Sequence, residues 1–244
     1  MLYVTMNRLG QVGKTTLARY VLAPPLKLSP DDILTAESST VDQAEGLVLT
    51  LTRDRDHAIA LPIALAELSG MKGSRVVDIG NTDVDLALPA VIRTAAEGHK
   101  LHVLVPVTTA PKAPPAALQL AEELQGHGVL VTLVANRLTK SDEPAADPGF
   151  IELGKAAAEV GALLLPVGLV ANDWFKGTKT FADIEKAAKA PKDSSAKTTA
   201  EGKLDLAAII KAGRKEVHKD VATEALNNAR EVFEAIQARE KTSG

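Results

Sequence analysis

Short apolar runs, rich in Val, Leu and Ile and without polar alternation, recur along the first two thirds of the chain. Such runs are typical of strands buried on both faces of a sheet. They predict six strands, at Leu2–Met6, Asp32–Ala36, Ser74–Asp78, Leu101–Val107, Val129–Ala135 and Ala162–Val167. Helical spacing of apolar residues lies between them, at Thr15–Leu22, His57–Ser69, Asp83–Glu97, Pro114–His127 and Phe150–Val160. This alternation predicts an α/β fold with a doubly wound, mostly parallel sheet.

The character of the chain changes near residue 186. Ala, Lys, Ser and Thr then dominate as far as Lys203, a composition typical of a linker. Apolar residues return with helical spacing over Leu204–Arg239, which predicts two helices. We therefore expect a nucleotide-binding sheet domain at 1–185, a linker at 186–203 and a C-terminal helical extension at 204–244. The last two segments hold 12 Lys and Arg against 9 Asp and Glu, and they are either a hairpin docked on the sheet domain or a tail that contacts a partner or DNA.

A glycine-rich run follows the first predicted strand and opens the first predicted helix: Gly10-Gln11-Val12-Gly13-Lys14-Thr15-Thr16. Glycines let backbone N–H groups point at an anion and a helix start adds partial positive charge, so these elements form a phosphate cradle. Lys14 is placed to reach the β- and γ-phosphates, and Thr15 to hold Mg²⁺. Arg8 stands where the full P-loop pattern has another glycine. The sequence predicts a binding site for a nucleoside triphosphate and Mg²⁺.

This run resembles the P-loop of the ParA/MinD-like ATPases, and within that division the chain resembles the plasmid stability protein StbB family. The similarity to StbB covers roughly the first 140 residues and lies in Asn7, the P-loop run, Leu22-Ala23-Pro24, Glu37-Ser38, Asp42 and Asp78-Ile79-Gly80. Most ParA/MinD-like proteins also carry a signature lysine just before the first glycine of the run, where this chain has Leu9. Arg8 either supplies a similar charge from the preceding position or is an ordinary loop arginine.

The resemblance assigns roles to acids near the ends of two strands. Asp78 and Gly80 match the Walker B and switch II positions, where the carboxylate holds Mg²⁺ and the turn senses the γ-phosphate. Asp83 is expected to cap the helix that follows. Either Glu37 or Asp42 orients the attacking water, or they are solvated acids of a switch loop. The lack of a clear water-activating residue predicts slow hydrolysis.

The resemblance also points to the base. Asn136, at the end of the fifth predicted strand, matches an asparagine that hydrogen-bonds adenine in ParA/MinD-like proteins. A GTPase would carry Asn-Lys-x-Asp here, whereas the residue three after Asn136 is Thr139, so ATP is favoured over GTP. Pro166–Ala171, after the sixth predicted strand, is expected to line the base.

The composition of the chain excludes several kinds of site and of location. The chain has no cysteine, which excludes disulfides, thiolate chemistry and Cys-ligated metal sites. The net charge of −3 argues against a strong overall field for nucleic acid. The most apolar stretch, Ala58–Leu68, is too short to span a bilayer and contains Pro62. No signal peptide precedes the first predicted strand, so we expect a cytoplasmic protein without a membrane span.

Three functions fit these features. The first is a slowly hydrolysing ATP switch that dimerises and, as the StbB resemblance implies, acts in plasmid stability, partition or conjugative transfer with a plasmid-encoded DNA-binding adaptor and weak non-specific DNA contact. The second is a P-loop kinase or synthetase for a small molecule, although the sequence shows no Arg cluster for an acceptor. The third is a nucleotide-binding interaction module without hydrolysis.

Overall fold

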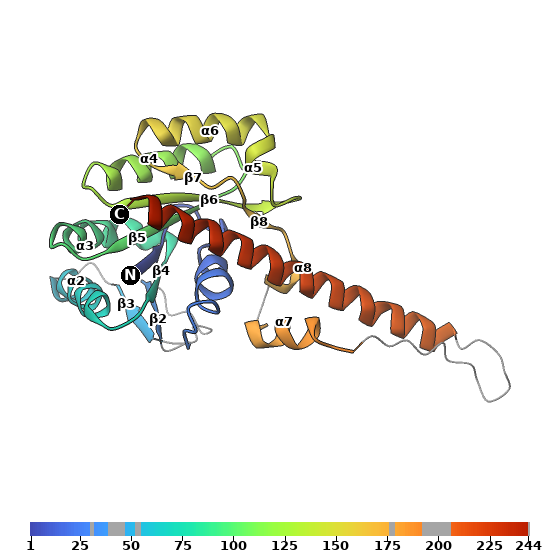
Figure 1. Cartoon of the computed structure of the whole chain (residues 1–244). Coiled ribbons are helices and arrows are strands. Elements are labelled where there is room, and N and C mark those ends of the chain that lie inside the picture. Colours follow the sequence, from blue (N-terminus) through green and yellow to red (C-terminus); the bar gives the residue numbers. More distant parts are fainter. Residues whose placement is uncertain (30–31, 39–46, 52–54, 176–178, 192–205, 244) are drawn as a thin grey trace.

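A parallel sheet of eight strands lies at the centre of the molecule (Figure 1). The computed structural model describes residues 1–29, 32–38, 47–51, 55–175, 179–191 and 206–243. Its strands are β1 Leu2–Thr5, β2 Ile33–Glu37, β3 Leu47–Thr50, β4 Arg75–Ile79, β5 Leu101–Val107, β6 Leu130–Leu138, β7 Leu163–Leu164 and β8 Leu169–Val170. Their order is β3-β2-β4-β1-β5-β6-β7, with β8 also beside β6, and each of these pairings is parallel. The predicted α/β fold with a doubly wound, mostly parallel sheet is confirmed.

Two strands escaped prediction, namely β3 and the two-residue β8. β3 has four residues at the edge of the sheet, and the side chains of Leu47 and Val48 are each 49% exposed. A run this short fits a strand or the start of a helix equally well, because too few residues are present to show a period. The ends of the six predicted strands lie within three residues of the observed ends. The largest differences are at β6, which is longer than expected, and at β7, which is shorter.

The helices follow the strands in the expected alternation. They are α1 Lys14–Thr16, η1 Leu17–Leu22, α2 Arg55–Gly70, η3 Asn81–Asp83, α3 Val84–Ala96, α4 Ala113–Gln125, α5 Glu143–Ala146, α6 Pro148–Glu159, η4 Asp173–Phe175, α7 Phe181–Ala188 and α8 Leu206–Ser243. None of the helices in the described part of the chain is both long and apolar enough to cross a membrane.

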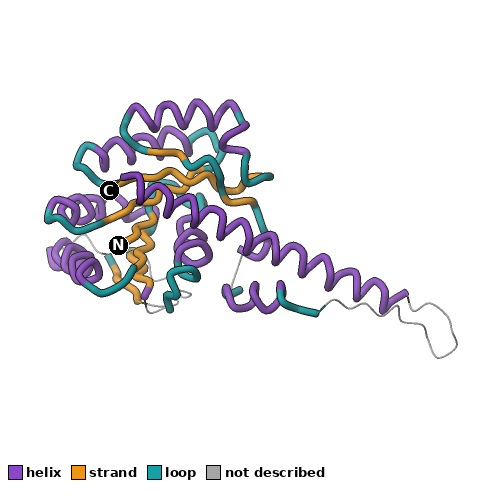
Figure 2. The backbone as a smooth tube through the Cα atoms, viewed as in Figure 1, coloured by secondary structure: helices purple, strands orange, loops and turns teal. Residues whose placement is uncertain are grey.

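The two faces of the sheet carry different helices (Figure 2). Alternate side chains of a strand point to opposite faces, so Leu2 and Val4 belong to one core and Tyr3 to the other. The first core is closed by α2, α3, α4 and α6. The second is closed by η1 and by the C-terminal half of α8, through Val232 and Ile236. The glycine-rich run thus leads from the central strand β1 directly onto the face that α8 shares.

The helix after the glycine-rich run is not a regular α-helix. One α-helical turn, α1, passes into the π-helix η1, in which the amide of Ala23 donates to the carbonyl oxygen of Ala18 at 3.1 Å. Such wide turns are rare and occur often at functional sites.

The C-terminal extension is one helix of 38 residues, so the prediction of two helices was wrong. The buried positions of α8 form one stripe from Ala222 to Ile236, with α7 packed beside its start, and the part of the helix before this stripe projects beyond the sheet (Figure 1). Gly213 suggests a break in the sequence, but the helix runs through it, which a helix interior tolerates at about 1 kcal/mol. The boundary predicted at residue 185 falls inside α7, and residues 192–205 of the predicted linker lie outside the described residues.

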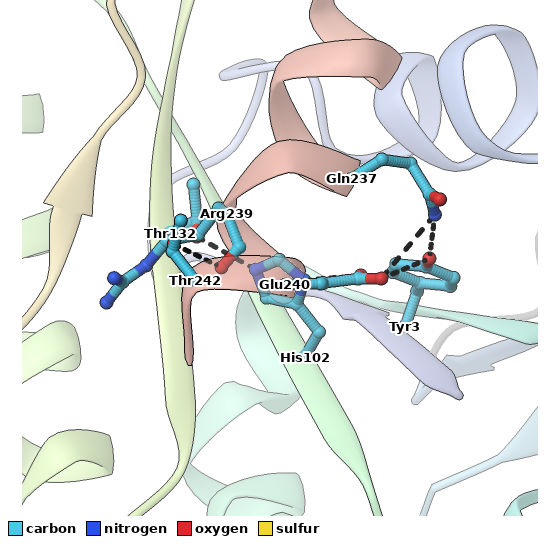
Figure 3. A network of polar contacts seen from close by, with 7 residues as sticks. All are labelled: Tyr3, His102, Thr132, Gln237, Arg239, Glu240 and Thr242. Atoms are coloured by element: carbon cyan, nitrogen blue, oxygen red, sulfur yellow. Dashed lines mark hydrogen bonds and ion pairs between the residues drawn. The ribbon is translucent and has the colours of Figure 1, made fainter. Parts of the chain in front are cut away.

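A buried polar network fastens the end of α8 to the sheet (Figure 3). Glu240 accepts a hydrogen bond from the Tyr3 hydroxyl at 3.2 Å and lies 2.9 Å from Nδ1 of His102. The other ring nitrogen of His102 lies 2.8 Å from the Thr132 hydroxyl, and Gln237 donates to the Tyr3 hydroxyl at 2.8 Å. Burial and the nearby Glu240 carboxylate raise the pKa of Tyr3. These contacts join the first strand to the last helix.

Candidate functional site

The glycine-rich run forms a tight turn that only glycine can complete. Gly13 has φ +104°, and a Cβ built on it would lie 1.8 Å from the side-chain nitrogen of Asn136. That nitrogen donates to the carbonyl oxygen of Val12 at 2.6 Å, while the side-chain oxygen of Asn136 accepts from the amide of Arg137 at 2.9 Å. Gln11 also has a positive φ, of 58°. Asn136 on β6 therefore clamps the turn that follows β1.

Asp78 stands beside this turn. Its two carboxylate oxygens accept hydrogen bonds from the hydroxyls of Thr15, at 2.6 Å, and Thr5, at 2.8 Å. Asp78 is only 4% exposed, and burial raises its pKa although both hydroxyls favour the ionised form. A hydroxyl and a carboxylate held together suit Mg²⁺, which binds few protein oxygens and shares its shell with phosphates. The structure brings together the two residues predicted to hold the metal.

Lys14 lies folded over the loop. Its ammonium donates to the carbonyl oxygen of Leu9 at 3.1 Å. Lys14 as a whole is only 9% exposed. Burial lowers the pKa of Lys14, while the charges of Asp78 and Glu37 oppose that shift. Burial of a charged ammonium costs free energy, and a polyphosphate bound beside Lys14 would offset that cost through its negative charge.

Glu37 and the turn after β4 are packed against each other. The amide of Gly80 donates to the carbonyl oxygen of Ala36 at 2.9 Å, and a Cβ on Gly80 would lie 2.8 Å from Cγ of Glu37. Burial, together with the charges of Asp78 and Asp83, raises the pKa of Glu37. Asp42, the other candidate to orient water, lies outside the described residues.

Asp83 has a different role from the expected one. It occupies the N-cap position of α3, but its side chain makes no capping hydrogen bond. Instead, its carboxylate accepts from the amide of Ser38 at 2.9 Å and from the hydroxyl of Thr82 at 3.2 Å. Asp83 therefore ties the end of β2 to the turn after β4, a contact that local sequence pattern cannot reveal because the partners are 45 residues apart.

A cavity of about 480 Å³ opens over the glycine-rich run. Its lining includes predicted residues from that run and from β6, namely Gln11, Gly13, Lys14, Thr15, Thr16 and Asn136. The opposite wall is made by Arg137, Val170, Ala171, Asn172 and Phe175. Of that wall, the segment expected to line the base supplies only Val170 and Ala171. The rest of the wall was not predicted, because Arg137 follows Asn136 on β6 without a motif of its own, and Asn172 and Phe175 lie at η4, which is too short to show a period.

The other predicted residues lie around this cavity rather than on its surface. Val12 is buried and turns its carbonyl oxygen to Asn136. Gly10 is exposed and faces Asn81, whose side chain would lie 3.7 Å from a Cβ there. Gly10 thus brings the P-loop close to the turn of Gly80.

Arg8 points away from the cavity. Its guanidinium pairs with Asp85 of α3 at 2.8 Å and with Glu123 of α4 at 2.6 Å. Both carboxylates raise the pKa of Arg8. Of the two interpretations of Arg8, this arrangement favours a structural arginine that joins two helices.

Two comparisons of the sequence with known proteins give no relative. No protein-family model matches the chain, and no curated protein matches its sequence. The candidate site is therefore argued from its own residues.

Proposed function

We propose that the chain is an ATP-binding switch protein of the ParA/MinD type that hydrolyses ATP slowly. The observation that carries the proposal is the hydrogen bond of 2.6 Å between Thr15 and Asp78, beside a turn in which Gly13 has φ +104°. This pairing of a P-loop hydroxyl with a strand-end carboxylate is what a Mg²⁺–triphosphate site requires.

The residues present fit ATP and Mg²⁺. Thr15 and Asp78 would hold the metal, which when bound neutralises charge on the phosphate oxygens. Lys14 would turn from the Leu9 carbonyl to the phosphates, and the P-loop amides would hold them from the other side. Asn136 lines the cavity and is the candidate to meet the adenine.

We expect slow hydrolysis because the sequence offers no clear water-activating residue besides Glu37 and Asp42. Glu37 lies beside the Gly80 turn, where it could orient water, and burial, together with the charges of Asp78 and Asp83, raises its pKa. A carboxylate with a raised pKa is suited to take a proton from water, so Glu37 is the candidate for that role in the described part of the chain.

The biological setting of the proposal comes from the StbB resemblance. It implies action in plasmid stability, partition or conjugative transfer, through a homodimer and a DNA-binding adaptor. The held position of Arg8 favours a second candidate, a nucleotide-binding module without hydrolysis, because Arg8 is engaged by Asp85 and Glu123 instead of supplying the charge of the signature lysine.

Phosphate release from ATP and from GTP tests the proposal directly. We expect slow release from ATP that exceeds release from GTP and disappears in Lys14→Ala. Lys100→Ala, at an exposed lysine just before β5 and so at the amino ends of the strands, is the matched control and should behave as wild type. Light scattering with ATP and with ADP then tests whether ATP drives dimer formation.

Each result separates the candidates. Binding of ATP without phosphate release would favour the non-hydrolysing module. Release that rises strongly with an added small-molecule acceptor would favour a kinase or synthetase. Absence of ATP binding by wild type would overturn the P-loop site itself.

A further inference from the structure

The wall of the cavity opposite the P-loop is fastened by α8. Asn228, on the docked half of that helix, is 8% exposed although it is polar. Its side-chain oxygen accepts from the amide of Val170 at 2.9 Å, and its side-chain nitrogen donates to the carbonyl oxygen of Gly168 at 2.9 Å. One residue of α8 therefore satisfies a donor and an acceptor of the wall.

This contact replaces a missing strand neighbour. β8 pairs with β6 with a register shift, and the wall is further held by Gly168 and Ala171, whose amides donate to Ser141 and Leu138 at 2.8 Å. A side-chain amide offers the donor and acceptor that a peptide group of an adjacent strand would offer. Without Asn228, a backbone amide and a carbonyl would lose their partners in a buried place, which is costly.

The rest of the wall, at Asn172 and Phe175, lies beside the same helix. Asn172 lines the cavity and donates to the Val221 carbonyl oxygen of α8 at 3.2 Å. Phe175, also in the lining, lies against the ring of Tyr20 with centroids 5.3 Å apart. Trp174, between them, packs 4.4 Å from the ring of His218 on α8. The wall thus contacts α8 at successive turns.

We propose that Asn228 is a positioning residue, through which the docking of α8 sets the shape of the base-side wall and so the affinity for the nucleoside part of the ligand. The inference rests on the proposed function, since it assumes that a nucleotide fills the cavity. Nucleotide binding must in turn stabilise the docking of α8, because coupling between two equilibria is reciprocal. Among the described residues, the hydrogen bonds of Asn228 go to Val170 and Gly168 and not to the phosphate-binding residues of the P-loop, so binding of the triphosphate part alone should not depend on it.

Calorimetric titration with Mg²⁺–ATP and with Mg²⁺–tripolyphosphate tests this separation. In Asn228→Ala we expect ATP to bind at least about fivefold more weakly, with tripolyphosphate binding unchanged. Asn227→Ala is the matched control, because Asn227 is an exposed asparagine at the adjacent position of the same helix. Equal loss for both ligands would mean a general structural role and would overturn the proposal, as would unchanged ATP affinity. Failure of wild type to bind either ligand would instead overturn the proposed function.

Hydrogen exchange of the wild-type chain gives a second readout that needs no variant. Mg²⁺–ATP should slow exchange at the Val170 amide and along residues 221–236 of α8, whereas Mg²⁺–tripolyphosphate should slow it only around the P-loop. The same protection by both ligands would contradict a wall positioned by α8. If Asn228→Ala fails to fold, this comparison alone decides the question.

Discussion

Gly13 shows how one residue can fix the site. Alanine there would adopt a strained φ and place its Cβ 1.8 Å from the Asn136 side chain, so the clamp on the P-loop must open. Gly13→Ala should abolish ATP binding, as measured by calorimetry. Gly98→Ala is the control, since Gly98 has φ +86° but nothing within 4 Å of a Cβ. It should lower stability by about 1–2 kcal/mol and leave ATP binding intact.

Lys14 is held in a place that disfavours its charge. Its pKa is lowered by burial, so at neutral pH the folded state carries an energetic cost that fades only as pH rises above the lowered value. Lys14→Met should therefore raise the free energy of unfolding without ligand by about 1 kcal/mol, measured in urea. Adding Mg²⁺–ATP should stabilise wild type but not this variant. A less stable Lys14→Met would show that the Leu9 contact outweighs desolvation.

Glu37 makes the stability of the fold depend on pH because its pKa is raised, whereas that of Lys14 is lowered. Because its pKa is raised on folding, the folded state binds its proton more tightly, and the contribution of Glu37 to stability falls as pH rises from about 4.3 through the raised value. Glu37→Gln removes that fall. The stability difference between Glu37→Gln and wild type should grow with pH over this range in urea unfolding, whereas exposed Glu234→Gln should track wild type throughout.

At the scale of elements, α8 divides into a docked half and a projecting half. Ile236 is fully buried on the sheet, and Val217 is 63% exposed on the projecting part. Ile236→Ala should cost about 2–4 kcal/mol in urea unfolding. Val217→Ala should change stability by less than about 0.5 kcal/mol. Equal costs would mean that the projecting half is also packed.

The elements also show what the sequence could and could not predict. The P-loop turn, its flanking strand and Asp78 follow from local patterns, because glycine placement and buried apolar runs constrain the backbone directly. The far wall of the cavity was predicted only at Val170 and Ala171. Its short segments hold their positions through contacts with α8, such as those of Asn228 with Gly168 and Val170, and pairing over 58–60 residues leaves no local pattern.

At the scale of the whole molecule, the charge is unevenly distributed along the chain. Residues 186–219 contain nine Lys and Arg against four Asp and Glu, while the whole chain has a net charge of −3. If the protein contacts DNA weakly, as the resemblance implies, we expect this part to carry the contact. Charge reversal at Arg214 and Lys215 should weaken duplex binding measured by fluorescence anisotropy at low salt. Reversal at Arg230, exposed on the docked half, should not.

The link between the first strand and the last helix has a consequence for the order of events during synthesis. The P-loop and β8 leave the ribosome long before residues 221–240, which supply Asn228 and the partners of Tyr3. A nascent chain can therefore form the phosphate-binding turn early but must wait for α8 before the opposite wall is fastened. Under the proposed function, full affinity for a nucleotide would appear only once α8 has been synthesised and covers the sheet.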